Sequence, residues 1–330
     1  MNLHQFRFVQ EAARHKLNLT ETARVLHTSQ PGISKAILEL EEELGIDIFT
    51  RHGKRLTRIT EPGHQVLNSI EIIMRELNNL KRIGEEFSQQ EVGTLSVAAT
   101  HTQARYVLPE PIAALRRQCP RVTVSLHQGT PQQVARMLLA DEAEIGIATE
   151  ALDQFEDLVT MPCYEWQHVA VFPSDHPLAK VERLSLEQLA AEPLVTYHPS
   201  FTGRTRIDTA FVQRGLHPQI ALEAIDSDVI KTYVRMGMGV GILAEMAVRD
   251  DPAFASSFDA KGGPQPATMV AKPVGYLFGR NTARIAFKRG AYLRQFVYTL
   301  AELLSPRLTR TLLTRTMAHP DSEGTQDYGL

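Results

Sequence analysis

A carboxamide, a hydroxyl and an ammonium group surround a Pro-Gly pair near the start of the sequence. In TSQPGISKAILELEEELG these groups belong to Gln30, Ser34 and Lys35, and the pair is Pro31-Gly32. Small hydrogen-bonding groups beside a residue without a side chain allow close approach of an electron-rich partner. We therefore predict that this stretch forms a recognition surface.

A helix must present these groups. Ser29 is suited to cap its N-terminus, and Pro31 fits the first turn, where backbone N–H groups have no partner within the helix. One apolar stripe recurs at spacings of four, three and four: Ile33, Ile37, Leu40 and Leu44. The acidic residues farther along are expected to face solvent: Glu39, Glu41, Glu42 and Glu43.

The preceding stretch, NLTETARVLH, predicts a shorter helix capped by Asn18. Two short helices joined by a tight turn form a helix-turn-helix, whose second helix enters the DNA major groove with its N-terminal residues. An ordinary helical pair in a globular core is the alternative.

The next stretch, IFTRHGKRLTRIT, alternates around Gly53 and carries five basic residues without an acid. It predicts a basic β-hairpin, or wing, whose side chains contact DNA phosphates; a merely solvated hairpin is the alternative. Because the chain has a formal charge of −3 and a pI of about 6.5, affinity for DNA must be local to this region. The predicted DNA-binding residues are Ser29, Gln30, Pro31, Gly32, Ser34, Lys35, Arg51, Lys54, Arg55 and Arg58.

One long helix is predicted from Pro62 to about Gln89. Its apolar residues alternate at spacings of four and three, a heptad seam that is typical of helices that pair. The expected dimerisation residues are Val66, Ile70, Ile73, Leu77 and Leu80. Two paired copies would present two reading helices to a two-fold DNA site.

A second group of polar residues marks a different kind of site. Thr100, Thr102 and Gln103 follow one predicted strand, Thr149 lies near the end of AEIGIATE, and Thr202 follows PLVTYHPSF. Ligands of α/β sheets bind outside the carboxyl ends of strands, where hydroxyls, amides and helix N-termini can hold a small anion. A turn hydroxyl satisfied by its neighbours is the alternative for any one threonine.

The elements that must position these residues alternate between strands and helices, which predicts an α/β fold of two lobes. The chain is expected to cross between lobes near Tyr164–Phe172 and to return through TARIAFKR. The predicted organisation is a winged helix-turn-helix domain (residues 1–60), a linker helix (61–92), an effector-binding domain (93–312; lobe I about 93–164 and 280–312, lobe II about 165–279) and a C-terminal tail (313–330) whose end has a disordered composition.

The composition and the absence of certain motifs argue against several classes of protein. The sequence has 330 residues with 43% apolar content, and it contains neither a long apolar stretch nor an apolar N-terminal region. Cys119 and Cys163 are isolated, as expected of packing residues in a reducing cytoplasm. Because no P-loop, nucleophile elbow or paired metal ligands occur, we expect no enzyme, metal or cofactor. A solute-binding protein would share the lobes but not the DNA-binding domain.

From Met1 to about Leu312 the sequence resembles LysR-type transcriptional regulators, and within them the CysB type. TSQPGISKAILELEEELGIDIF is general to the family, whereas THTQARYVLP and LVTYHPSFTGRT are typical of the CysB type. The resemblance implies a two-lobed effector domain similar to periplasmic binding proteins and assembly as a homodimer or homotetramer. It implies an effector site of Thr100, Thr102, Gln103, Thr149, Trp166 and Thr202.

The resemblance also implies a function. CysB-type members activate genes of sulfur uptake and cysteine biosynthesis with RNA polymerase, in response to an N-acetylserine-like or O-acetylserine-like inducer and to opposing sulfate or thiosulfate. A sister type that controls alkanesulfonate use is the open alternative. One stretch, GGPQPATMVAKPVGY, departs from the family pattern; its composition predicts a surface loop, with an edge segment of lobe II as the alternative.

Overall fold

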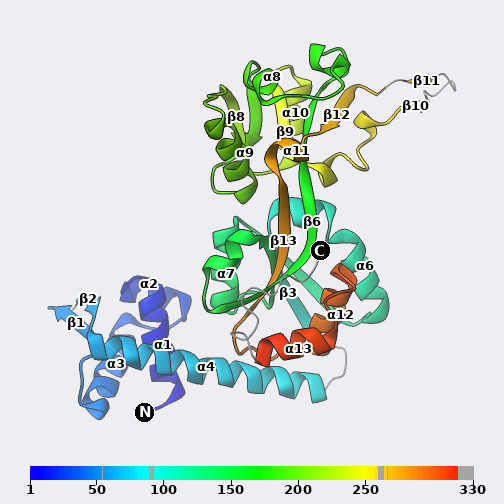
Figure 1. The fold of residues 1–330 in the computed structure, drawn as a ribbon. Coiled ribbons are helices and arrows are strands. Elements are labelled where there is room, and N and C mark those ends of the chain that lie inside the picture. Colours follow the sequence, from blue (N-terminus) through cyan, green and yellow to red (C-terminus); the bar gives the residue numbers. More distant parts are fainter. Residues whose placement is uncertain (54, 89–92, 259–263, 266, 319–330) are drawn as a thin grey trace. The chain divides into compact units, whose positions relative to one another are not determined.

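The computed structural model describes residues 1–53, 55–88, 93–258, 264–265 and 267–318. The chain divides into two compact units, residues 1–88 and residues 89–330, each of which is described by itself (Figure 1). Lys54 of the predicted wing and the end of the predicted tail lie outside the described residues. The α/β fold class with an N-terminal winged helix-turn-helix is confirmed.

The first unit, which we call the head, is helical apart from one hairpin. Asn2 caps the first helix, Asn18 caps the second and Ser29 caps the third, each by accepting hydrogen bonds from backbone N–H groups. Its elements are α1 (Leu3–Arg14), α2 (Leu19–Val25), α3 (Gln30–Leu44), β1 (Phe49–His52), β2 (Arg55–Ile59) and α4 (Glu61–Ser88).

The predicted apolar stripe of α3 forms the centre of the head's core. Ile33, Ile37 and Leu40 are fully buried, and they pack with residues of α1, of the hairpin and of the first turns of α4. The long helix α4 therefore completes the core of the head instead of forming a separate segment.

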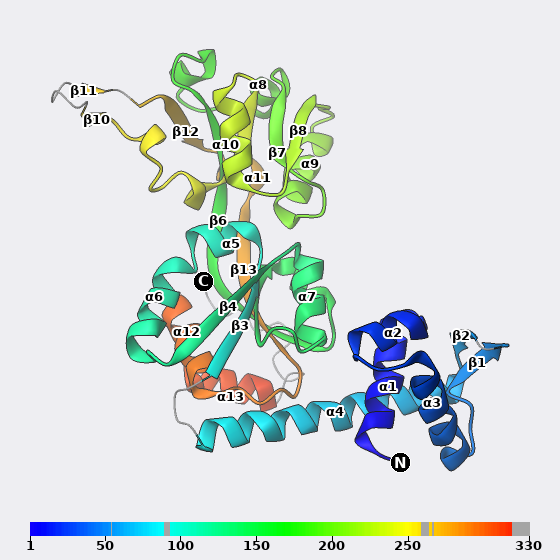
Figure 2. The ribbon, with the colours of Figure 1, turned by 180° about the vertical axis from the view of Figure 1, so that it is seen from behind.

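The second unit is built on a mixed sheet of two lobes (Figures 1 and 2). Its strand order is β4-β3-β5-β13-β6-β9-β7-β8, with β12 also paired to β6. Lobe I contains β3 (Gly93–Ala99), β4 (Val122–Gln128), β5 (Ile145–Thr149) and β13 (Arg280–Lys288). Lobe II contains β7 (Leu194–Tyr197), β8 (Ile220–Ala224), β9 (Val240–Ala244) and β12 (Met269–Pro273), and β6 (Leu158–Pro173) runs through both lobes.

Each lobe has three strands that run parallel to one another, and the strands that cross between the lobes are antiparallel to their neighbours. Strand β3 is parallel to β4 and β5, and β7 is parallel to β8 and β9. Strand β6 is antiparallel to β13 in lobe I and to β9 and β12 in lobe II. The crossing that the sequence places near Tyr164–Phe172 is thus a single continuous strand, and β13 returns the chain to lobe I.

Successive side chains of a strand point to opposite faces of the sheet, so each lobe has two faces to cover. Helices cover both of them. In lobe I, Leu95 and Val97 pack with the helices α6, α12 and α13, whereas Ala98 packs with α7 and η1. In lobe II, α8, α9 and α11 cover one face and α10 covers the other. Lobe I contains α5 (His101–Tyr106), α6 (Pro109–Gln118), α7 (Pro131–Leu139), η1 (Glu150–Gln154), α12 (Gln295–Leu304) and α13 (Arg310–Ala318).

The remaining elements of lobe II are η2 (Pro177–Lys180), α8 (Leu186–Ala190), α9 (Thr202–Gln213), α10 (Ser227–Arg235), η3 (Glu245–Ala247), η4 (Pro252–Phe254), α11 (Gly275–Phe278) and the short strands β10 (Ser257–Phe258) and β11 (Pro264–Gln265). The composition of the Pro- and Gly-rich stretch GGPQPATMVAKPVGY predicts a surface loop. For β12, which lies within this stretch, that prediction is wrong. Residues 269–273 form an edge strand on β6 and bury Met269, so tertiary burial overrides the turn-like composition.

The predicted tail also begins too early. Residues 313–318 belong to α13, and Leu313 is fully buried in the core of lobe I. The buried Leu313 therefore makes residues 313–318 part of lobe I.

A buried ion pair joins the start of α12 to lobe I. Arg294 Nε donates to Glu144 Oε1 at 3.1 Å, Arg294 Nη2 donates to Glu144 Oε2, and the same guanidinium donates to the carbonyl of Thr94 at 2.7 Å. The two side chains are 6% and 8% exposed. Burial this deep makes each charge dependent on the other.

Replacing Arg294 by methionine should destabilise the two-lobed unit by about 3–5 kcal/mol, because the Glu144 carboxylate stays buried without this cation. Urea unfolding followed by circular dichroism measures the change. Arg280→Gln is the control, since its ion pair with Glu165 is exposed and should contribute little. An unfolding midpoint for Arg294→Met equal to that of the wild type would contradict the assignment.

Candidate nucleic-acid interface and effector site

The N-terminal turns of α3 present the predicted reading residues at the surface of the head. Ser29 Oγ accepts a hydrogen bond from the N–H of Gly32 at 3.2 Å. A Cβ atom on residue 32 would lie 3.0 Å from Ser29 Oγ, so glycine lets the cap sit close. Pro31, Gly32 and Lys35 are exposed, and Gln30 and Ser34 are half-buried.

The wing lies beside these turns. Gly53 turns the hairpin with a φ of +60°, which an L side chain rarely adopts. A hollow of about 750 Å³ is lined by Gln30 of α3, by His52 and Arg55 of the wing, and by the start of α2. Arg55 and Arg58 are exposed. Helix, wing and hollow thus form one basic concave surface that suits a duplex.

Two residues of this region occupy places that the sequence analysis did not predict. Glu41, expected in solvent, is only 6% exposed, and its Oε1 accepts the backbone N–H groups of Ile48 (2.8 Å) and Phe49 (3.0 Å). Arg51, expected on DNA phosphates, bonds Glu41 Oε2 and Ser34 Oγ, each at 3.3 Å. The chain folds back after α3, so the carboxylate satisfies N–H groups that would otherwise be buried alone.

The predicted pairing seam of α4 divides into two parts. Ile70 is 2% exposed and Val66 is partly buried, and both pack against the head's own core. Ile70 is therefore used within the head itself, because the first turns of α4 cover α1, whereas a contact of Val66 with a second copy stays a prediction. Farther along, Leu77 is half-buried, whereas Ile73 and Leu80 are 40% and 67% exposed.

In the second unit, strand ends of lobe I bring several predicted polar residues together. Thr100 follows β3, and its N–H donates to the carbonyl of Ile147 on the adjacent strand β5, which ends at Thr149. Thr100 and Thr149 are 3% and 5% exposed. Gln103 is buried, and its Oε1 accepts a hydrogen bond from the hydroxyl of Tyr164.

Lobe II contributes the start of helix α9 to the junction. Helix α9 begins at Thr202, and its N-cap residue, Phe201, makes no side-chain hydrogen bond to the first turn. A Cβ on the next residue, Gly203, would lie 3.0 Å from His168 Nε2 and 3.2 Å from Trp166 Cη2. The start of α9 therefore touches β6 where the two lobes meet. Thr102 also lies near lobe II, because its side chain adjoins the hydroxyl of Tyr197.

Unpartnered polar atoms collect at this junction. Among the described residues, the buried side-chain nitrogens and oxygens without a hydrogen-bond partner are His101 Nδ1, Glu150 Oε2, Trp166 Nε1, His168 Nε2, Arg206 Nε and Asn281 Oδ1. They come from α5, η1, β6, α9 and β13, the segments that adjoin the junction. Because such atoms cost free energy when unpaired, their concentration indicates a site for a polar ligand.

Of these six residues the sequence analysis predicted only Trp166 and missed the other five. Arg206 Nη2 of lobe II reaches Glu150 Oε1 of lobe I at 3.0 Å, and this oxygen also accepts the N–H of Thr282 at 2.8 Å. Burial, together with the charge of Arg206, lowers the pKa of His168 to about 3, so its ring is neutral. Asn281 pairs with Trp166 across β13 and β6. Glu150 directly follows Thr149, and Arg206 lies one helical turn after Thr202. This closeness to predicted site residues is the sequence signal that could have identified Glu150 and Arg206.

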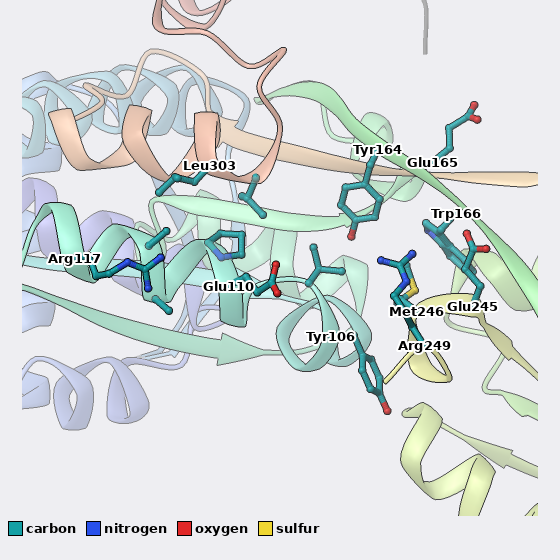
Figure 3. A pocket seen from close by; sticks show the side chains of 15 residues that line it. Tyr106, Glu110, Arg117, Tyr164, Glu165, Trp166, Glu245, Met246, Arg249 and Leu303 are labelled. Atoms are coloured by element: carbon teal, nitrogen blue, oxygen red, sulfur yellow. The ribbon is translucent and has the colours of Figure 1, made fainter. Parts of the chain in front are cut away.

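Trp166 also belongs to a second hollow. Figure 3 shows this cavity of about 810 Å³, whose lining includes Tyr106, Tyr164, Trp166 and Arg249. Because Trp166 also adjoins Gly203, its indole forms a wall between this cavity and the start of α9. Trp166, which the resemblance assigns to the effector site, thus lies at the lobe junction in the lining of this cavity.

Two further features concern function class. Within the described ranges, no cluster of three His, Cys, Asp or Glu residues is placed to hold a metal ion. None of the helices searched in those ranges is long and apolar enough to cross a membrane.

A winged helix-turn-helix head joined to a two-lobed domain with a polar junction defines a ligand-responsive, DNA-binding regulator. Residues 3–64 match the family described as "Bacterial regulatory helix-turn-helix protein, lysR family", and residues 88–256 match "LysR substrate binding domain". The chain belongs to the LysR family of transcriptional regulators.

Individual relatives agree with this assignment. The chain is 52% identical to the HTH-type transcriptional regulator CysB of Burkholderia cenocepacia, over 96% of this chain and 97% of that protein. It is 49% identical to the regulator SsuR of the same organism, over 93% and 96%. The crystal structure of the cofactor-binding domain of the Cbl regulator matches with a TM-score of 0.62 and 40% identity, over 70% of this chain and 95% of that chain.

Replacing Arg55 by glutamine should weaken binding to every DNA sequence alike, because an exposed wing cation contacts phosphates rather than bases. The slope of log K against log salt should fall by about 0.9 for one lost phosphate contact. Fluorescence anisotropy at several salt concentrations measures the slope, with a duplex that the wild type selects from a random library. Lys180→Gln, the same charge change in lobe II, is the control; equal slopes for both variants would argue against a wing contact.

Proposed function

We propose that this regulator controls genes of sulfur assimilation and cysteine biosynthesis, chiefly as an activator, in response to a small anion held between the lobes. The observation that carries the effector site is the concentration of unpartnered buried polar atoms where β6, β13 and α9 meet. The sulfur regulon is supported by the identity to CysB over nearly the whole chain. The proposed effector-binding residues are Thr100, Thr102, Gln103, Thr149, Trp166 and Thr202.

The unpartnered atoms at the junction are of two kinds. Trp166 Nε1 and Arg206 Nε can only donate hydrogen bonds, whereas Glu150 Oε2 can accept one. Sulfate or thiosulfate would satisfy only the donors. N-acetylserine carries a carboxylate for the donors and an amide N–H and a hydroxyl for the acceptor. We therefore propose an acylated serine as inducer and the inorganic anions as opposing ligands.

Regulation of alkanesulfonate use is the second candidate function, favoured by the identity to SsuR and to the Cbl regulators. Mapping the sites that this protein occupies across the genome would distinguish the two. Occupancy of cysteine-biosynthesis promoters supports the first function, and occupancy confined to organosulfur-utilisation promoters supports the second.

Assembly is part of the proposal. The exposed apolar residues of α4 support pairing of two copies, and two such pairs would form a homotetramer. Double-stranded DNA is the partner of the head, RNA polymerase is the partner at activated promoters, and the cytoplasm is the compartment where both are met.

Leu80→Asp should dissociate the α4 pair, because a carboxylate would be buried in an apolar contact without a partner. Sedimentation velocity should show a smaller species, and affinity for a two-half-site duplex should fall. Lys81→Asp, the exposed neighbour outside the seam, is the matched control. Ile70→Asp should instead unfold the head, because Ile70 lies in its core. An unchanged oligomer for Leu80→Asp would overturn the proposed seam.

Thr100→Ala should weaken effector binding about tenfold or more, because one hydrogen bond to a charged group contributes about 1.5–3 kcal/mol and 1.4 kcal/mol is a factor of ten. Calorimetric titration with N-acetylserine and with sulfate measures this change. DNA binding without effector should persist, because the head is a separate unit.

Thr123→Ala, an exposed threonine of β4 in the same lobe, is the control for this titration. Equal affinity of Thr100→Ala and the wild type for both ligands would remove Thr100 from the site. Absence of binding to the wild type itself would refute this effector class.

A further inference from the structure

Arg51 is the one predicted wing contact whose guanidinium points into the head. Its side chain is 20% exposed, and it bridges a buried carboxylate, Glu41, and the hydroxyl of Ser34 on the reading face of α3. We propose that Arg51 is a positioning residue that orients the Ser34 hydroxyl for DNA recognition, rather than a phosphate contact. This inference rests on DNA binding through α3.

Glu41 anchors the guanidinium. One of its oxygens accepts the N–H groups of Ile48 and Phe49, at 2.8 and 3.0 Å, and so holds the carboxylate at the start of β1. The other oxygen bonds Arg51 Nη2. Because both oxygens are engaged and the carboxylate is buried, the guanidinium has a fixed support.

The anchored guanidinium then sets the role of Ser34. Arginine is a donor only, so Ser34 Oγ accepts the hydrogen bond from Arg51 Nη1. Elsewhere in the head, Thr22 and Ser69 donate their hydroxyl hydrogens to the carbonyl four residues earlier. In the described part of the chain, Ser34 makes no such bond, and its hydrogen stays available to donate outward.

The orientation has a chemical consequence for the DNA. A hydroxyl that donates outward is matched by an acceptor, which in the major groove is purine N7, guanine O6 or thymine O4. An amino group of adenine or cytosine at the same place would be a poorer partner. Arg51 thereby acts on sequence choice through Ser34, whereas Arg58 is exposed on the wing and, among the described residues, makes no bond to Ser34.

The test uses the full-length protein and a duplex that the wild type selects from a random library, together with every single base-pair substitution of it. Glu41→Gln keeps an oxygen for the N–H groups of Ile48 and Phe49, but it presents an amide donor to Arg51 and breaks the bridge. In Glu41→Gln, discrimination between base pairs should fall about tenfold at the position where Ser34→Ala also loses it. The slope of log K against log salt should stay unchanged. The double variant should be no worse than Ser34→Ala alone.

A direct phosphate contact predicts the opposite for Glu41→Gln: the freed guanidinium would tighten binding to all duplexes and steepen the salt slope by about 0.9. That result, or unchanged discrimination, would overturn the proposal. Arg58→Gln is the matched control, and it should lower the slope without changing discrimination.

Arg51→Lys gives a second measurement should Glu41→Gln fail to fold, as judged by thermal unfolding. A lysine keeps the charge but cannot bridge Glu41 and Ser34 in the same geometry, so discrimination should again fall. Wild-type discrimination in Arg51→Lys would contradict the proposal. Failure of the wild type to select any duplex would instead refute DNA reading by α3 itself.

Discussion

Strand β6 belongs to the sheets of both lobes, and the two-lobed unit depends on this continuity. Its first part pairs with β13 in lobe I, and from His168 onward it pairs with β9 and β12 in lobe II. An unbroken strand links the two lobes at the place where the pairing changes partner. That place, between Trp166 and His168, is also where buried polar atoms lack partners.

The change of strand partner and the unpaired polar atoms coincide, an arrangement that suits control by a ligand. Each buried polar group without a partner costs about 1–3 kcal/mol. A ligand that pairs with these groups in one arrangement of the lobes, and not in another, shifts the balance by the difference in its affinity for the two. The Arg206–Glu150 pair and the bond from Tyr106 to Asp228 link the two lobes directly.

In the head, a small number of residues must hold the wing against α3. The small core of the head is supplemented by Glu41, which serves the backbone of β1 and the side chain of Arg51 together. A buried carboxylate is tolerated here because N–H groups and a guanidinium surround it. The wing and α3 are therefore joined by polar bonds as well as by Phe49 and Leu56 in the core.

The sequence by itself determined what depends on neighbours along the chain. Spacing and residue type give Ser29 as a cap, the stripe from Ile33 to Leu40 and the turn at Gly53. They also give Thr100 directly after its strand and Thr149 at the end of its strand. The tertiary structure alone decided which polar and apolar side chains were taken into the interior. Ile70 joined the core of the head, and Glu41 was buried against Ile48.

The same holds at the lobe junction, where Glu150 meets Arg206 and Asn281 meets Trp166 across long separations in sequence. Helical or strand periodicity cannot show such contacts, because they depend on how whole elements pack.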